Sequence, residues 1–206
     1  SDDPVAAWAA YEGRVGRDDF AAWVWRFRAY EAAVAAAKHS FETRKLDAQE
    51  RYKILMKAGD IIASRKEAIA RLITLESGLC IKDTLYEVGR ASDVLLFAAQ
   101  QALVDDGQSF ACDLTHHGKS RRVHTMREPM MGVISAITPF NHPLNQVIHK
   151  VAPSVATNNR MVLKPTEKTP LAALLLADVL YEAGLPPPML SVITGDPAEI
   201  ADEMLT

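Results

Sequence analysis

Apolar residues recur every three or four positions through the first hundred residues, and in short alternating or continuous runs after that. The first pattern is typical of amphipathic helices, and the second is typical of strands. Proline and glycine are scarce in the first part, where Ser77-Gly78 is the clearest break. We therefore expect an antiparallel set of helices with short connections, at residues 29–41, 47–64, 66–75 and 83–102.

The pattern changes at Asp105–Gly107, where two alternating runs begin. Gln108–Thr115 and Ser120–Thr125 alternate in the manner of strands, and the polar sequence His116–Lys119 lies between them, which predicts a β-hairpin. A two-stranded arm is only marginally stable alone, so we expect it to join another sheet or a partner subunit. The paired histidines have no further ligands at metal-binding spacing, so we expect no metal site there.

Strands and helices alternate from residue 132 onward. The continuous apolar run Gly132–Ile137 predicts a strand that is buried on both faces of a parallel sheet. Three strands joined by two helices would form half of a doubly wound α/β unit. The other predicted strands are 160–163 and 190–194, and the predicted helices are 144–156, 170–183 and 197–205, with Gly184–Pro188 ending the second helix.

Composition narrows the range of partners. The net charge of −3 gives no overall basic field for nucleic acid. No apolar run approaches the ~18 residues that a membrane span needs. Cys80 and Cys112 lie far apart and fit neither a disulfide framework nor a metal site. We therefore expect a cytoplasmic protein with no nucleic-acid or membrane partner.

Polar turns follow the first two predicted strands, within the sequences Ile137–Pro143 and Met161–Glu167. Ligands of open α/β sheets bind outside the carboxyl ends of the strands, so both turns are candidate ligand contacts. On composition alone, Asn141 is more readily an ordinary turn residue. In the same way, Lys164 and Glu167 are typical of a solvated charged loop.

Six ordered motifs within residues 30–206 resemble the N-terminal portion of aldehyde dehydrogenases. They are Arg127–Pro129, Ile137–Pro143, His149–Pro153, Val162–Pro165, Glu182–Pro186 and Val192–Gly195. A narrower resemblance is to the phosphonoacetaldehyde dehydrogenase branch. It is carried by Asp105–Phe110, Cys112–Thr115, His117–Lys119, Arg121–Val123 and the histidine that follows Asn141.

The resemblance implies an aldehyde dehydrogenase-like α/β fold, with N-terminal helices, a β-hairpin arm and the first half of a Rossmann-type doubly wound parallel sheet. It also implies a homodimer or homotetramer of the full-length protein. The implied organisation is an unassigned extension at 1–29, the helical part of the NAD-binding domain at 30–105, an oligomerisation hairpin at 106–126 and a truncated Rossmann-like half at 127–206.

In the family, a cysteine thiolate attacks an aldehyde to give a thiohemiacetal, hydride passes to the nicotinamide, and water releases the acid. The resemblance assigns Asn141 as a side-chain donor to the oxyanion, a contribution typically worth ~2.7–4 kcal/mol. The family's nucleophile, its general-base glutamate and its glycine-rich pyrophosphate turn come later in the chain than residue 206. We therefore expect this sequence to be an N-terminal fragment that is inactive alone.

The cofactor contacts implied by the resemblance follow the strand ends. A carboxylate at Glu167 would repel a 2′-phosphate, which favours NAD over NADP, although the nearby lysine weakens this preference. For Gly195, a simple strand-to-helix turn is an equal alternative. The implied contacts are Ile137, Thr138 and Pro139 on the nicotinamide side, Lys164 and Glu167 on the adenosine ribose, and Gly195 near the adenine.

The same resemblance places Arg90 and His142 at the substrate entrance. Two cationic side chains would suit a small anionic aldehyde, and the planar fork of arginine matches phosphoryl oxygens. Arg90 could instead pair with Glu87 or Asp93 on its own helix, and His142 could simply begin a helix. The first hypothesis is oxidation of phosphonoacetaldehyde to phosphonoacetate. The alternatives are another small acidic aldehyde, such as succinic semialdehyde, and a non-catalytic nucleotide-binding or oligomerising module.

Overall fold

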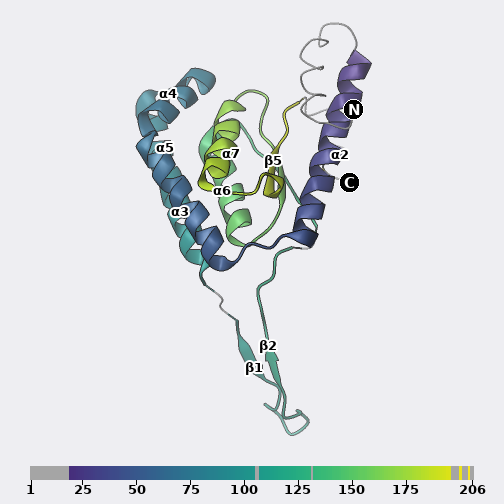
Figure 1. Ribbon diagram of the computed structural model, residues 1–206. Helices are drawn as coiled ribbons and strands as arrows, with labels where there is room; N and C mark the ends of the chain where they lie inside the picture. The colour runs from purple at the N-terminus through teal and green to yellow at the C-terminus, as the bar shows by residue number, and fades with distance from the viewer. Residues whose placement is uncertain (1–18, 105–106, 131, 196–199, 201–203, 205–206) are drawn as a thin grey trace.

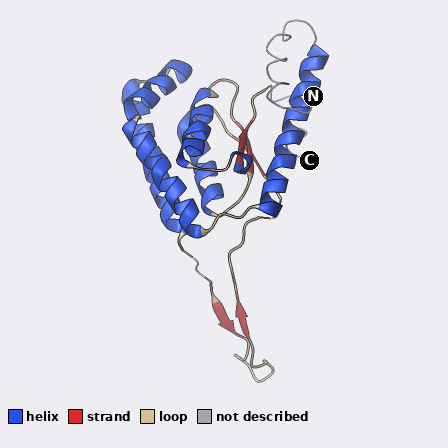
Figure 2. Cartoon of the chain, in the orientation of Figure 1, coloured by secondary structure: helices blue, strands red, loops and turns tan. Residues whose placement is uncertain are grey.

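The computed structural model describes residues 19–104, 107–130, 132–195, 200 and 204, with side chains from residue 30 onward. Its first part is helical and comprises α2 (Asp19–Thr43), α3 (Ala48–Ser64), α4 (Lys66–Ser77) and α5 (Ile81–Ala102). A hairpin of β1 (Ser109–Ala111) and β2 (Arg122–His124) follows. The remainder contains β3 (Ile134–Ile137), α6 (Pro143–Ala156), β4 (Met161–Lys164), α7 (Leu171–Ala183), the 3-10 helix η1 (Pro187–Met189) and β5 (Leu190–Val192), as Figure 2 shows.

The helices predicted from periodicity in the first part are confirmed, and their ends have identifiable causes. α3 begins at a capping box, in which the Asp47 side chain accepts from the Glu50 amide and the Glu50 side chain accepts from the Asp47 amide. α4 ends at Gly78, whose φ of 75° lies in the left-handed region that glycine adopts without strain. α2 starts at Asp19, so this helix extends into the segment expected to be an unassigned extension.

The three parallel strands are arranged in the order β3–β4–β5, and helices lie on both faces of the sheet (Figure 1). α6 and α7 pack between the sheet and the helical layer of α3, α4 and α5. α2 lies across the opposite face, against β4 and β5. The predicted half of a doubly wound α/β unit is therefore confirmed, with an additional helical layer behind α6 and α7.

The burial of the strands follows their position in the sheet. β4, the central strand, is buried along its whole length. The sequence predicts burial of both faces over 132–137 as well, and this prediction is wrong. Pairing begins at Ile134, and the alternate residues Ser135 and Ile137 are exposed, Ile137 by 45%. β3 lies at the edge of the described sheet, and a groove of about 290 Å³ lies between it and α2.

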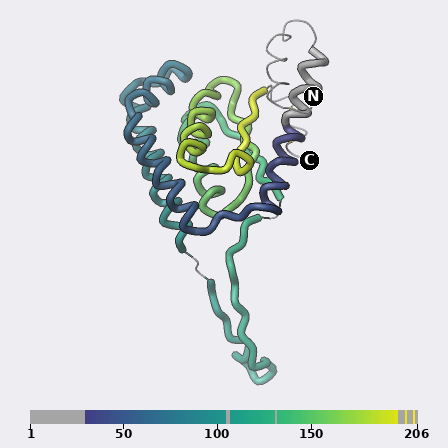
Figure 3. Tube along the Cα trace, in the orientation of Figure 1, coloured from purple at the N-terminus to yellow at the C-terminus, as the bar shows by residue number. Residues whose placement is uncertain are grey.

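The predicted hairpin is confirmed, although its strands are shorter than the sequence pattern predicts. β1 and β2 are antiparallel, with Phe110 opposite Val123, and both of these side chains are about half exposed. The arm extends away from the rest of the chain (Figure 3). The helix predicted at 197–205 lies almost entirely outside the described residues.

Candidate functional site

The turns that follow β3 and β4 meet at the carboxyl edge of the sheet. The strands pair with Ile137 opposite Lys164, and the Thr138 amide donates to the Lys164 carbonyl at 3.2 Å, so the ladder continues into the first turn. Beyond the strands, the Lys168 ammonium lies 4.6 Å from the centre of the Phe140 ring, which is a cation–π distance. The structure therefore brings the two predicted turns into contact.

Asn141 lies in the bend between β3 and α6 and is exposed. Pro143 is the first residue of α6, where its fixed φ and missing N–H suit a helix start. Among the described residues, none forms a hydrogen bond with the Asn141 side chain. Its amide N–H groups are therefore available to a ligand at this edge, as an oxyanion donor requires.

The carboxylate of Glu87 caps α6, a role that the sequence analysis missed. Glu87 is 2% exposed, and its Oε1 accepts from the backbone amides of Leu144 and Asn145, at 2.9 Å each. The negative charge also complements the positive N-terminal end of the helix. The signal in the sequence was the place of Glu87 within the apolar stripe of α5, between the buried residues Thr84 and Ala91. A carboxylate in that stripe needs a buried partner.

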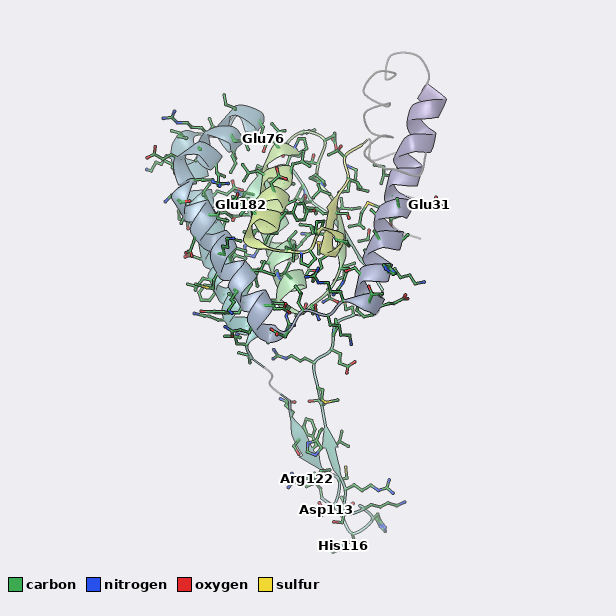
Figure 4. The ribbon with its side chains drawn as sticks, in the orientation of Figure 1. Glu31, Glu76, Asp113, His116, Arg122 and Glu182 are labelled. Atoms are coloured by element: carbon green, nitrogen blue, oxygen red, sulfur yellow. The ribbon has the colours of Figure 1, made fainter. Side chains whose placement is uncertain are left out.

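A second glutamate caps α7 in the same manner. The Glu76 carboxylate, at the end of α4, accepts from the backbone amides of Leu171 and Ala172 at 2.8 and 3.0 Å. Figure 4 shows this labelled side chain between α4 and α7. Burial raises the pKa of the Glu76 carboxyl; the two amide hydrogen bonds oppose this rise, and the charge of Glu87 adds to it. The sequence analysis missed Glu76 as well.

The two caps limit where a dinucleotide could bind. In many open α/β sheets a pyrophosphate binds to free N–H groups at a helix start. Here the first amides of α6 and α7 are already hydrogen-bonded to Glu87 and Glu76. A pyrophosphate therefore fits neither of these two helix starts.

Lys164 and Glu167 face one another at the end of β4. Lys164 is 2% exposed, and its ammonium donates to the Pro165 carbonyl at 3.2 Å and lies 3.8 Å from Glu167 Oε2. The solvated-loop alternative is therefore wrong for Lys164, whereas the Glu167 side chain is about half exposed. This pair fits a vicinal diol such as a ribose, because the carboxylate can accept from both hydroxyls and the ammonium can donate to one.

The remaining candidate cofactor contacts lie at the same edge of the sheet. Ile137 and Pro139 are exposed, and Gly195 follows β5 and is half-buried. Thr138 is buried, and its hydroxyl has no hydrogen-bond partner among the described residues. Because Ile137 and Pro139 are exposed, a flat ring of a ligand could contact the end of β3.

The two candidate substrate cations have different surroundings. Arg90 is exposed on α5. Within the described residues, no ion pair joins it to Glu87 or Asp93, the partners that its own helix offered. His142 precedes α6 without capping it, and its Nδ1 lies 3.7 Å from Glu87 Oε2. His142 therefore already faces the Glu87 carboxylate, whereas the Arg90 guanidinium remains available to bind an anionic substrate.

The sequence model of the aldehyde dehydrogenase family matches residues 27–206. The chain belongs to the aldehyde dehydrogenase family. It is 42% identical over 173 residues to a 3-sulfolactaldehyde dehydrogenase of Priestia aryabhattai, and the match covers 84% of this chain and 36% of that protein. It is 36% identical over 175 residues to the mitochondrial succinate-semialdehyde dehydrogenase of Arabidopsis thaliana, and the match covers 84% of this chain and 32% of that protein.

Solved structures agree with this assignment. The chain superimposes with a TM-score of 0.78 and 33% identity on a glyceraldehyde-3-phosphate dehydrogenase of Methanocaldococcus jannaschii complexed with NADP, covering 86% of this chain and 38% of that one. The aldehyde dehydrogenase fold expected from the sequence motifs is therefore confirmed. The chain spans about a third of the length of the curated relatives that it matches. Within its described part, no helix is both long and apolar enough to cross a membrane.

Proposed function

We propose that the whole protein to which this chain belongs oxidises a small anionic aldehyde to the corresponding acid with a nicotinamide cofactor. The observation that carries the proposal is the family match over residues 27–206. The free side-chain amide of Asn141, at the carboxyl edge of the sheet, supports it because this reaction forms an oxyanion. Since the chain spans about a third of its curated relatives, the activity is proposed for the whole protein.

Asn141 would supply the electrostatic part of the reaction. When a nucleophile adds to the aldehyde carbon, the carbonyl oxygen becomes an oxyanion, and a donor already in place stabilises it by ~2.7–4 kcal/mol. Neither Cys80, at the exposed start of α5, nor Cys112, in the hairpin, belongs to a turn that follows a strand of the parallel sheet. We therefore assign the nucleophile and the general base to other parts of the whole protein.

Lys164 and Glu167 would bind the adenosine ribose of the cofactor, and the exposed residues at the end of β3 would contact its nicotinamide side. The nicotinamide, when bound, supplies the hydride acceptor. The Glu167 charge favours an unphosphorylated ribose, as in NAD, and the adjacent Lys164 ammonium offsets part of this preference. The neighbour from Methanocaldococcus jannaschii was crystallised with NADP, so the activity test includes both dinucleotides.

An anionic substrate is supported by Arg90 and by the names of the relatives. Arg90 is exposed on α5, one helical turn from Glu87, which contacts the start of α6 just after Asn141. Two of the relatives are named for sulfolactaldehyde and succinate semialdehyde, and each of these molecules has an acidic group at a distance from its aldehyde. Phosphonoacetaldehyde has the same combination and is our first candidate. Sulfolactaldehyde and succinic semialdehyde are the alternatives within this class.

The test is a comparison of kcat/KM for these three aldehydes and for neutral butyraldehyde, using the whole protein with NAD and with NADP. We expect anionic aldehydes to be preferred over butyraldehyde by at least about tenfold, which is about 1.4 kcal/mol. Arg90→Leu should reduce this preference, and Arg90→Lys, which keeps the charge, should retain most of it. No oxidation of any aldehyde would refute the proposed function, and equal rates for neutral and anionic aldehydes would refute the anionic substrate class.

A further inference from the structure

Both helices that start at the candidate site lack a capping side chain of their own. His142 precedes α6 and Pro170 precedes α7, and neither side chain caps its helix. In each case the missing acceptor comes from the helical layer behind, as Glu87 for α6 and Glu76 for α7. An uncapped start leaves amide groups without partners, so each carboxylate stabilises the first turn of its helix.

Each carboxylate is connected to a different half of the candidate site. Glu87 accepts from Leu144, three residues after Asn141. Glu76 accepts from the first residue of α7, four residues after Glu167. Loss of the first cap would therefore loosen the turn that contains the oxyanion donor. Loss of the second cap would loosen the turn that faces the ribose.

The two carboxylates share one support within the helical layer. The hydroxyls of Thr74 in α4 and Thr84 in α5 lie 2.9 Å apart, and Thr84 is fully buried. Thr74 is two residues before Glu76, and Thr84 is three residues before Glu87. This hydrogen bond fixes α4 against α5 close to both carboxylates. The positions of the two caps are therefore set by the helical layer and not by the turns that they stabilise.

We propose that Glu87 and Glu76 are positioning residues with separate tasks, in which Glu87 places Asn141 for the oxyanion and Glu76 places the Lys164–Glu167 turn for the cofactor ribose. This assignment rests on the proposed function, because it refers to the aldehyde reaction and its cofactor. Both glutamates act through the helix start that they cap. Glu87 has a second connection to the first turn, since its free oxygen lies 3.7 Å from Nδ1 of the histidine that follows Asn141.

Steady-state kinetics of the whole protein separates the two tasks. Glu87→Ala should lower kcat at least about tenfold and change the KM for NAD less than about threefold, because a displaced donor is lost mainly in the transition state. Glu76→Ala should raise the KM for NAD at least about threefold, with a smaller fall in kcat than Glu87→Ala. Glu87→Gln keeps an oxygen acceptor for both amides, so it should fold and restore most of the rate.

A double-mutant cycle distinguishes positioning from a general loss of structure. If Glu87 acts through Asn141, Glu87→Ala should lower kcat less than about threefold further in an Asn141→Ala background. A further fall in that background as large as in the wild type would overturn the proposal. Equal effects of the two glutamate variants on both kcat and the KM for NAD would also overturn it.

Hydrogen exchange in the whole protein tests the positioning without any assay of activity. Glu87→Ala should accelerate exchange at the amides of Leu144 and Asn145, and leave Leu171 and Ala172 unchanged. Glu76→Ala should have the opposite selectivity. Selective exchange with an inactive wild-type protein would refute the proposed function alone. An active wild-type protein in which either variant accelerates both helix starts would refute the separate tasks alone.

Discussion

The starts of α6 and α7 lie at neighbouring strand ends, and in both the first amides are hydrogen-bonded to a glutamate from another helix. Their surroundings differ, because Glu87 is 2% exposed and Glu76 is only partly buried. Both Glu76 oxygens accept amide hydrogen bonds, whereas one Glu87 oxygen is buried with no hydrogen-bond partner among the described residues.

The difference between the two caps shows how burial changes the contribution of a carboxylate–amide hydrogen bond to stability. Leu171, the first residue of α7, is 47% exposed, so water can replace part of a lost cap there. The start of α6 is buried, so its amides would lose their partner without a replacement, and an unsatisfied buried group destabilises the folded state strongly. We therefore expect the same substitution to have unequal effects at the two positions.

The largest expected effect is on the stability of the chain when each cap is truncated. Glu87→Ala should lower the free energy of unfolding by about 2–3 kcal/mol, because two buried amides lose a charged acceptor. The matched variant Glu76→Ala should lower it by about 1 kcal/mol, as for an ordinary helix cap. Urea denaturation of the three proteins measures both values. Equal losses would show that burial does not distinguish the caps.

A smaller effect is expected in the pH dependence of stability. Burial raises the pKa of the Glu76 carboxyl above its usual value of 4.5, so the folded state binds this proton more tightly than the unfolded state. The stabilisation that comes from protonation of Glu76 is therefore complete below that value and is lost as the pH rises through the raised pKa.

Glu76→Gln isolates this contribution because glutamine does not titrate. The free energy of unfolding of the wild type, minus that of the variant, should decrease as the pH rises above 4.5. Denaturation at a series of pH values from about 4 to about 8 spans the expected change. A constant difference, or one that increases with pH, would contradict the predicted direction.

The smallest effect is expected for the direct contact between the two turns. The Lys168 ammonium lies over the exposed Phe140 ring, and exposed cation–π pairs contribute about 0.5–1 kcal/mol. Lys168→Ala and Phe140→Leu should each destabilise the chain slightly. The coupling energy from their double-mutant cycle, measured by denaturation, should be about 0.5 kcal/mol. Additive losses would mean that the contact between Lys168 and Phe140 does not help to hold the two turns together.

Local sequence patterns predicted much of the fold because they report on local geometry. The capping box at Asp47 and the glycine at 78 set the ends of α3 and α4 within a few residues of the positions that were read from periodicity. The error at β3 has a different origin. The run 132–137 is apolar enough for a buried strand, but its burial depends on the distance of α2 from the edge of the sheet.

The position of the candidate site at the strand ends was also predictable from the sequence, whereas the burial of its side chains was not. The resemblance to aldehyde dehydrogenases assigned Asn141, Lys164 and Glu167, and their places at or after strand ends agreed with it, because parallel strands bring their ends together. The burial of Lys164 could not be predicted, since a lysine after a strand is usually solvated. Glu87 was considered only as a surface partner of Arg90, because neighbours on a helix are visible in the sequence and a contact 57 residues away is not.

The sequence by itself determined the family of this chain, the order of its helices and strands, and the residues that follow the strand ends. Those properties depend on hydrophobic periodicity and on short motifs, which act over a few residues. Only the tertiary structure decided which side chains cap α6 and α7, which lysine is buried and which face of β3 is exposed. These depend on packing between segments that lie far apart in the sequence, where burial determines whether a charge or an amide needs a protein partner.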